Sequence, residues 1–466
     1  GNHSRSYVTE VDGQLYQLPI CWYPRASLWD VCPGFEHDSS HFRRHATPSC
    51  VFCHNGRMVD VEGTISAYRP PIPNGIGCER CHGPGEEHVA RWREGGIPTG
   101  GLDPTIVNPR RLPQPERVEV CFQCHLGDSK ATERVATIDT SLLDWRPGQR
   151  LGVAIEPFRF AAPTRHDFGL SAQADRLVLS ECWKRSAGEI DCITCHDPHT
   201  PVYDPDRADD FFNRRCRGCH DRDDCSGTPA ARAATSPEDD CTGCHMRRAE
   251  PDDQRYTVMT DHWIRRSIDE PRRDPRVDLS VEPTLPGSYG ARPAAEQAFY
   301  RGRANFLLSF KTADPRRRSM WEQAERDFDA AIAGGLERGD AWFFLGRVRQ
   351  YLGRPDEALE AFERAVGIDP EYDDAALALG TALLESGQVG RAREVLGAIV
   401  EREPEHAGAL AELGRSFLGE DLDRALALYE RAARHETWNG SLFAAQGMIL
   451  AQSGRFEDAR ERTREA

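Results

Sequence analysis

Six copies of one short motif constrain this chain more than any other feature of its sequence. In each copy two cysteines enclose two other residues and a histidine follows at once, and all six copies lie within the first 245 residues. The cysteine pairs are Cys50 and Cys53, Cys78 and Cys81, Cys121 and Cys124, Cys192 and Cys195, Cys216 and Cys219, and Cys241 and Cys244. The histidines that follow them are His54, His82, His125, His196, His220 and His245. Twelve of the sixteen cysteines therefore belong to one repeated pattern.

Cys-x-x-Cys-His is the attachment signature of c-type haem. The two thiols bond to the two vinyl groups on one edge of the porphyrin, and the adjacent histidine reaches the iron as its proximal ligand. Paired cysteines also build tetrahedral zinc sites, but zinc does not require a histidine after every second cysteine. Thioredoxin-like redox pairs need a βαβ setting, which this sequence does not show. We therefore expect six covalently bound c-type haems.

The density of these motifs limits what the first part of the chain can fold into. Six haems within residues 1–267 leave little protein for a conventional apolar core. We expect the haem faces to form much of the interior, carried by short helices and long loops. The predicted fold is mainly α, with haems close enough to pass electrons in sequence.

The sixth coordination position of each iron decides between electron transfer and catalysis, because a second protein ligand closes the site to substrates. Eight further histidines lie in this part of the chain: His3, His37, His41, His45, His88, His166, His199 and His262. His199 follows His196 too closely to cap the same haem easily, so we expect it to ligate a neighbouring haem. His88 follows His82 by six residues, an arrangement similar to that of His199 after His196 but with a turn inserted.

The stretch HDSSHFRRH holds three of these histidines, which share one face if the segment is helical. We expect one or two of them to ligate and take His41 as the candidate, with His37 or His45 as alternatives. The remaining candidates are isolated in the sequence and are His3, His166 and His262.

Methionine is the other common axial ligand, and it raises the reduction potential. Only Met58, Met246 and Met259 lie in this part of the chain, and histidine is the favoured ligand. We therefore predict low potentials. No Cys-x-x-Cys-Lys motif of the kind associated with nitrite-reducing multihaem enzymes is present, which weakens the interpretation as such an enzyme. We predict no catalytic residues.

Four cysteines lie outside the motifs. Their number is even, and c-type haem matures outside the cytoplasm, where disulfides persist. Proximity in the sequence favours the pairs Cys21–Cys32 and Cys182–Cys225, and free buried thiols are the alternative.

The net charge of −16 argues against a nucleic-acid partner, and a solvated acidic surface or a basic redox partner accounts for it. No stretch approaches 18 consecutive apolar residues, so we expect no membrane span. The sequence starts at Gly1 without a methionine or the parts of an export signal, so we expect a processed or truncated product. A periplasmic or extracellular location is expected.

Residues 268–294 are rich in proline and charge and are expected to form a linker. A period of 34 residues follows, as Gly346, Gly380 and Gly414 illustrate. This is the tetratricopeptide period, in which each repeat is a pair of helices. We expect about five pairs in residues 295–466, with the clearest pair at 340–352 and 355–367. Such pairs form an α-solenoid, which usually binds proteins.

The chain resembles bacterial multihaem cytochromes related to the nitrifier tetrahaem cytochrome, which are often fused to tetratricopeptide repeats. The stretches that carry the resemblance are GNHSRSY, CHGPGEEH, CFQCHLG, ECWKRSAGEIDCITCHDPH, CTGCHM and VMTDHWIRR. The resemblance implies distal ligation by His3, His88, His166, His199 and His262. Relatives often carry more sequence and a further haem motif before the GNH stretch. Which haem His3 would ligate is therefore an open question.

We therefore expect extracytoplasmic electron transfer through six mostly bis-histidine haems, with the repeats docking redox partner proteins or assembling the chain. Head-to-tail stacking through a non-closing interface would give a conducting filament. The alternative is a multihaem oxidoreductase that reduces a nitrogen or sulfur oxyanion at one open haem. A scaffold with vestigial haems is the remaining, less favoured interpretation.

Overall fold

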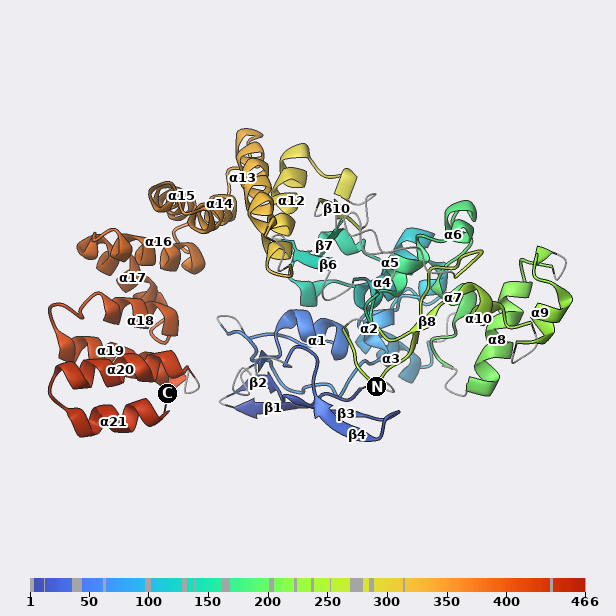
Figure 1. Ribbon diagram of the computed structural model, residues 1–466, viewed down its shortest axis with the longest axis horizontal. Helices are drawn as coiled ribbons and strands as arrows, with labels where there is room; N and C mark the ends of the chain where they lie inside the picture. The colour runs from blue at the N-terminus through green and yellow to red at the C-terminus, as the bar shows by residue number, and fades with distance from the viewer. Residues whose placement is uncertain are drawn as a thin grey trace. The chain divides into compact units, whose positions relative to one another are not determined.

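The computed structural model describes residues 4–11, 13–35, 44–61, 64–96, 102–127, 132–137, 140–160, 168–200, 205–221, 224–235, 239–251, 253–268, 280–284, 289–312, 315–435 and 439–465. It divides the chain into two compact units, Gly1–Ala291 and Arg292–Ala466 (Figure 1). The first unit contains all six motifs, and we call it the haem region. The second contains the repeats, and we call it the repeat region. No helix among the described residues is long and apolar enough to cross a membrane.

Short helices dominate the haem region, as predicted. They are α1 (Pro48–His54), α2 (Glu79–His82), α3 (Glu86–Arg93), α4 (Gln114–His125), α5 (Gln173–Leu177), α6 (Glu181–Arg185), α7 (Cys192–Cys195), α8 (Pro205–Arg217), α9 (Pro229–Ala233) and α10 (Cys241–His245). Single 3₁₀ turns lie at Pro109–Arg111, Leu142–Asp144 and Leu151–Val153. Proline begins several of these helices, where its missing N–H costs nothing.

Four small antiparallel sheets accompany these helices and were not predicted. One orders β1 (Val8–Val11), β2 (Gln14–Gln17) and β5 (Arg44–His45), and another orders β10 (Val281–Pro283), β7 (Ile155–Phe160) and β6 (Thr132–Ala136). The two-stranded sheets are β3 (Ile20–Tyr23) with β4 (Leu28–Val31), and β8 (Arg248–Ala249) with β9 (Met259–Thr260). Because β10 lies within residues 268–294, part of the expected linker is instead an edge strand paired with β7.

The apolar core of the haem region is modest and lies around α1 and α4. Phe52, Phe122 and Trp145 are buried together there, and the Phe52 and Trp145 rings meet edge to face with centroids 6.2 Å apart. Met58 is buried in the same cluster, where it serves as packing.

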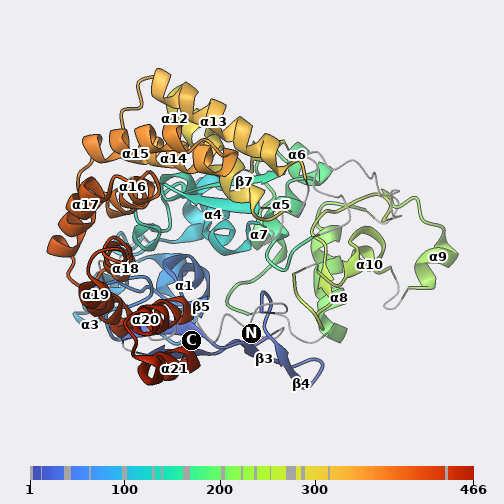
Figure 2. The same ribbon diagram turned by 60° about the vertical axis from the view of Figure 1, so that its left-hand side comes forward.

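The repeat region consists of ten helices among its described residues. They are α12 (Ala294–Ser309), α13 (Arg317–Ala333), α14 (Gly339–Leu352), α15 (Pro355–Ile368), α16 (Asp373–Glu385), α17 (Val389–Arg402), α18 (Ala407–Arg415), α19 (Leu422–His435), α20 (Gly440–Gln452) and α21 (Phe456–Glu465). The helices pair in order, and successive pairs follow one another (Figure 2). The predicted α-solenoid is confirmed.

The recurring glycines explain the period. A Cβ atom on Gly346 would lie 2.5 Å from a ring carbon of Phe362, and one on Gly380 would lie 2.5 Å from Leu396 Cδ2. Each glycine thus lets the first helix of a pair approach a large side chain of the second. Gly353 has a positive φ of 79° and ends α14 in the left-handed conformation that favours glycine.

Candidate functional site

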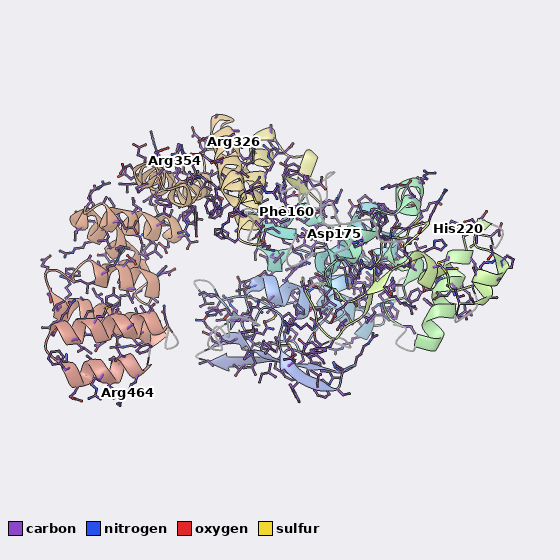
Figure 3. The ribbon with its side chains drawn as sticks, in the orientation of Figure 1. Phe160, Asp175, His220, Arg326, Arg354 and Arg464 are labelled. Carbon is purple, nitrogen blue, oxygen red and sulfur yellow. A yellow bond between two sulfur atoms is a disulfide. The ribbon has the colours of Figure 1, made fainter. Side chains whose placement is uncertain are left out.

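Each motif occupies a single helical turn. The backbone N–H of His82, His196 and His220 donates to the carbonyl of the first cysteine of its own motif, at 3.0, 2.9 and 3.0 Å. His220 projects beyond the end of α8 (Figure 3), while α1, α4 and α10 contain their motifs entirely. Positions i, i+3 and i+4 share one helix face, so two thiols and one imidazole are presented together. This geometry fits attachment of a haem edge by two thioethers and ligation of its iron.

Local capping sets where two of these turns begin. Asp191 precedes the fourth motif, and its carboxylate accepts from the N–H of Thr194 at 2.8 Å, in a reciprocal capping box. Asp240 precedes the sixth motif and accepts from the N–H of Gly243 at 2.8 Å. An aspartate N-cap of this kind stabilises a helix by about 1 kcal/mol, which matters for helices of only four or five residues.

Two pairs of imidazole rings face each other across the haem region. The ring centroids of His82 and His199 are 5.8 Å apart with an interplanar angle of 19°. Those of His196 and His262 are 6.0 Å apart at 22°. Each pair joins a motif histidine to a histidine outside the motifs that the sequence nominated as a distal ligand.

These separations suit two axial ligands of one metal. An imidazole nitrogen lies about 2 Å from a metal ion that it binds. Two imidazoles on opposite sides of one ion would therefore have centroids roughly 6 Å apart. The near-parallel pairs His82–His199 and His196–His262 have this spacing, so the residues present fit bis-histidine ligation.

Hydrogen bonds at the second ring nitrogen orient several of these histidines. The Nδ1 atom of His82 lies 2.8 Å from the Val107 carbonyl oxygen, and that of His245 lies 2.7 Å from the Arg265 carbonyl oxygen. A carbonyl only accepts, so each Nδ1 is the donor, and in the neutral imidazole Nε2 then carries the lone pair. Metal-ligating histidines commonly have this second partner.

His262 is held in the same way by the Thr260 carbonyl oxygen, at 3.0 Å. Burial, with a smaller contribution from the neighbouring His196, lowers the pKa of His262 to about 4. The ring is therefore neutral at pH 7, which is the protonation state that binds a metal.

Three further histidines have polar partners at Nδ1. His125 faces Gln173 Oε1 at 2.9 Å, His45 faces Ser66 Oγ at 2.9 Å, and His88 faces the Asp103 carboxylate at 2.8 Å. His45 also packs against Tyr16, with ring centroids 4.6 Å apart. The candidates His3, His37, His41 and His166 lie outside the described residues.

Cysteines of different motifs touch one another. Cys53 Sγ donates to the Gln123 carbonyl oxygen at 3.3 Å, Cys124 Sγ lies 3.9 Å from the Cys53 carbonyl oxygen, and Arg134 Nη1 donates to Cys53 Sγ at 3.1 Å. Cys121 and Cys192 form a second such contact. The first and third motifs, and the third and fourth, therefore meet at their attachment edges.

The fifth and sixth motifs also meet, since the Cys216 and Cys241 thiols lie close together. In addition, Gln123 of the third motif donates from Nε2 to the Arg80 carbonyl oxygen of the second at 3.1 Å. Contacts between residues far apart in the sequence thus bring the first four motifs into one group and the fifth and sixth into another.

A buried ion pair supports the segment that carries His262. Asp261 accepts from Arg176 Nε at 2.8 Å and from Arg176 Nη2 at 2.6 Å. The guanidinium groups of Arg176 and Arg265 lie 5.2 and 4.7 Å from the Trp263 ring centroid. Nothing in the local sequence signals these partners, because Arg176 precedes Asp261 by 85 residues.

Of the two disulfides expected between the cysteines outside the motifs, Cys21–Cys32 is confirmed. Cys21 and Cys32 form a disulfide that joins the two strands of the β3–β4 hairpin. Cys182 and Cys225 are free thiols, so the predicted Cys182–Cys225 disulfide is wrong. Cys182 lies instead beside cysteines of the fourth and fifth motifs, and Cys225 beside Cys244 of the sixth.

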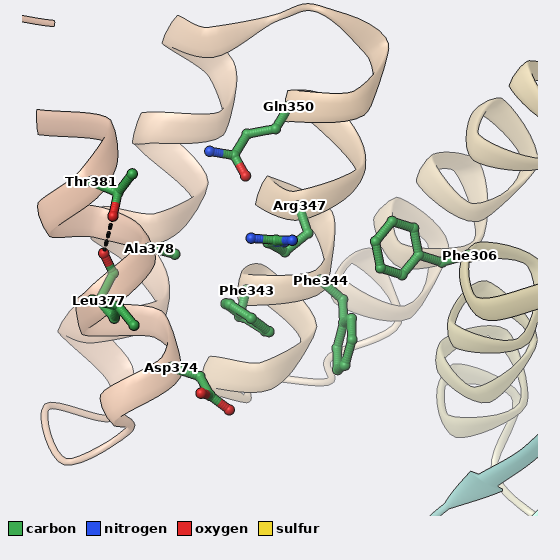
Figure 4. Close-up of a pocket in the computed structure, with 9 residues that line it drawn as sticks. All are labelled: Phe306, Phe343, Phe344, Arg347, Gln350, Asp374, Leu377, Ala378 and Thr381. Atoms are coloured by element: carbon green, nitrogen blue, oxygen red, sulfur yellow. Dashed lines mark hydrogen bonds between the residues drawn. The ribbon is translucent and has the colours of Figure 1, made fainter. Parts of the chain in front are cut away.

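The repeat region carries a pocket of about 440 Å³ between α12, α14 and α16. Figure 4 shows its lining residues, which are Phe306, Phe343, Phe344, Arg347, Gln350, Asp374, Leu377, Ala378 and Thr381. Aromatic and aliphatic side chains thus border the pocket together with a guanidinium, an amide, a carboxylate and a hydroxyl.

Family models match three parts of the chain. Residues 35–83 match the model described as cytochrome c554 and c-prime, and residues 316–373 and 351–413 match tetratricopeptide repeat models. The multiheme cytochrome MtrA of Shewanella baltica is 25% identical over 193 residues, which are 37% of this chain. The chain spans about half, 52%, of the length of that relative.

Solved repeat structures are also similar. MamA of Desulfovibrio magneticus is 21% identical over 35% of this chain and 92% of its own, with a TM-score of 0.31. A Pseudomonas aeruginosa pilF structure is 20% identical over 37% of this chain and 77% of its own, with a TM-score of 0.32. Together, the cytochrome and repeat matches support a multihaem c-type cytochrome fused to tetratricopeptide repeats.

Proposed function

We propose that the chain conducts electrons outside the cytoplasm through six covalently bound c-type haems, most of them ligated by two histidines. The observation that carries this proposal is the crossed pairing of histidines. His199, three residues beyond the fourth motif, faces His82 of the second, and His262 faces His196 of the fourth. Ligands shared in this way close iron sites and tie neighbouring haems together.

Haem iron supplies the redox chemistry by cycling between its ferric and ferrous states. The residues of the chain supply spacing, orientation and potential. Contacts between the motifs support two groups of neighbouring haems. The first motif meets the third, which also meets the second and fourth, and the fifth meets the sixth. The remaining link is the segment of His262, whose neighbour Arg265 holds His245 of the sixth motif.

The proposed distal ligands are His88, His199 and His262 among the described residues, together with His3, His166 and His41. His37, or the described His45, is the alternative to His41. The low pKa of His262 and the Nδ1 partners of His88 and His262 support the first group. Two histidine ligands at most irons imply low potentials.

A periplasmic or extracellular location is proposed because haem attachment and disulfides both belong to compartments outside the cytoplasm. The disulfide between Cys21 and Cys32 supports this. The pocket on α14 and α16 supports docking of a protein segment, with Arg347 and Asp374 available to pair its charges. A redox partner is the proposed occupant.

Assembly into a filament is a second form of this proposal. The β3–β4 hairpin favours it, because Ile20, Trp29 and Val31 are 49, 58 and 41% exposed on it. Exposed apolar faces of this kind mark protein interaction sites. Sedimentation of the haem-loaded chain across a concentration series tests self-association. A monomer at every concentration would contradict assembly into a filament.

The proposed function is tested by low-temperature electron paramagnetic resonance of the oxidised protein, quantified against total haem. We expect six haems per chain, all low-spin. His199→Ala and His262→Ala should each turn one haem high-spin, while His406→Asn in the repeat region should change nothing. A high-spin haem in the parent protein would instead favour an oxyanion reductase, and unchanged spectra in both variants would refute the ligand assignments.

A further inference from the structure

His88 differs from the other described candidate ligands in the group that holds its ring. Its Nδ1 atom lies 2.8 Å from Asp103 Oδ2, whereas the Nδ1 atoms of His82, His245 and His262 face backbone carbonyls. Among these four histidines, His88 is the one whose Nδ1 lies within hydrogen-bond distance of a carboxylate. His199 Nδ1 is 3.9 Å from the nearest aspartate oxygen, beyond a hydrogen bond.

The surroundings of Asp103 keep its carboxylate charged. Oδ1 accepts from the Thr105 backbone N–H at 2.9 Å and from Thr105 Oγ1 at 2.5 Å, and Oδ2 also accepts from Trp92 Nε1 at 3.2 Å. Arg91 Nη1 lies 3.7 Å away. An ionised carboxylate only accepts hydrogen bonds, so His88 Nδ1 is the donor, and in the neutral imidazole Nε2 carries the lone pair.

The helix that carries His88 presents a matching face. His88, Arg91 and Trp92 occupy positions i, i+3 and i+4 of α3, which lie side by side on a helix surface. All three reach Asp103, and the rings of His88 and Trp92 have centroids 5.9 Å apart. With only 11% of the Asp103 side chain exposed, water competes weakly for these contacts.

Resting on the proposed role of His88 as an axial ligand, we propose that Asp103 is the residue that positions His88 and lowers the reduction potential of the haem that His88 caps. A carboxylate partner makes an imidazole a stronger electron donor than a carbonyl partner does. A stronger donor stabilises ferric over ferrous iron, and axial ligand strength and outer hydrogen bonds set haem potentials. This haem consequently has a lower potential than it would have with a neutral hydrogen-bond acceptor at position 103.

The test is a potentiometric titration of the haem-loaded full chain, followed by optical absorbance and electron paramagnetic resonance. In Asp103→Asn, one midpoint potential should rise and the low-spin signal of one haem should shift, with the other haems unchanged. Asp103→Glu should return that potential toward the parent value. Trp92→Phe removes a donor to Asp103 but leaves His88 held, so it should leave every potential near its parent value.

The variant His88→Ala tests the assignment of His88 as a ligand separately from the role of Asp103. One haem should become high-spin, and adding Asp103→Asn should then leave the potential of that haem unchanged. If His88→Ala creates no high-spin haem, the ligand assignment fails. If it does but Asp103→Asn moves no potential, or moves several together, the role of Asp103 is overturned while the proposed function stands.

Discussion

The two regions of the molecule bury different kinds of side chain. In the repeat region the cores are alanine, leucine and aromatic residues from neighbouring helices, and Asp327 is the one fully buried charged residue among those described. In the haem region the buried charged residues are Arg80, Glu119, Glu156, Asp175, Arg176, Asp191, Asp240 and Asp261. Burying a charge is costly unless it is paired and hydrogen-bonded. The haem region therefore depends on specific partners and on its cofactors, whereas the repeat region depends on apolar packing.

The largest expected effect comes from preventing haem attachment at the third motif, which should unfold one region and not the other. The third motif contacts the first, second and fourth, so replacing Cys121 and Cys124 with serine should unfold much of the haem region and leave the repeats folded. Limited proteolysis with mass spectrometry should then release a resistant fragment beginning near residue 292.

Serine at both Cys182 and Cys225 is the matched control for that experiment, because these cysteines lie outside the motifs. It should leave the digestion pattern of the parent protein intact. Equal resistance of both regions after loss of the third motif would show that the haem region folds without its cofactors.

Asp261→Asn should have the next largest effect, confined to the haem region. The side chains of Arg176 and Asp261 are 5 and 1% exposed, and removing one partner of a buried ion pair costs about 3–5 kcal/mol. Guanidinium unfolding followed by the haem absorbance band measures this loss. Asp144→Asn is the control, since Asp144 is 71% exposed in its pair with Arg146 and should lose less than about 1 kcal/mol.

Gly380→Ala should destabilise the repeat region alone, by about 1–3 kcal/mol, because the added Cβ would meet Leu396. Thermal unfolding followed by circular dichroism tests it, with an unchanged haem spectrum expected. A Cβ atom added at Gly397 would meet none of the described residues within 4 Å, so Gly397→Ala should stabilise α17 by about 0.5–1 kcal/mol. Similar melting temperatures for the two variants would contradict this account of the glycine period.

Arg391→Ala should have the smallest effect. Its pair with Glu363 spans 2.7 Å, but the two side chains are 53 and 38% exposed. Exposed pairs contribute below about 1 kcal/mol, so the unfolding temperature should barely move. A loss as large as that of Gly380→Ala would mean that surface charge contributes to the repeats as much as packing does.

Local patterns predicted the repeat region well. The expected helices at 340–352 and 355–367 are Gly339–Leu352 and Pro355–Ile368 in the structure, because a helical period records which residues face the next helix. The motifs likewise predicted short helical turns. The β6–β7–β10 sheet was not predicted, since Val281–Pro283 pairs with residues more than 120 positions earlier.

The same reason explains what was missed around the candidate site. Proximity in the sequence suggested Cys182–Cys225, yet the fold takes these two thiols to different motifs. Asp103 and Asp261 carry no local signature of their roles. Asp103 contacts a histidine 15 residues earlier in the sequence, and Asp261 contacts an arginine 85 residues earlier. Sequence indicated which residue types would bind haem and left open which of them meet.

The crossed histidine pairs also set an order of events during synthesis. His199 emerges 117 residues after the His82 that it faces, and His262 emerges 66 residues after His196. In the proposed ligand scheme, a chain cut short before residue 262 is therefore not a shorter conductor. It is a protein in which the haem held by His196 lacks its proposed second ligand and keeps an open iron position.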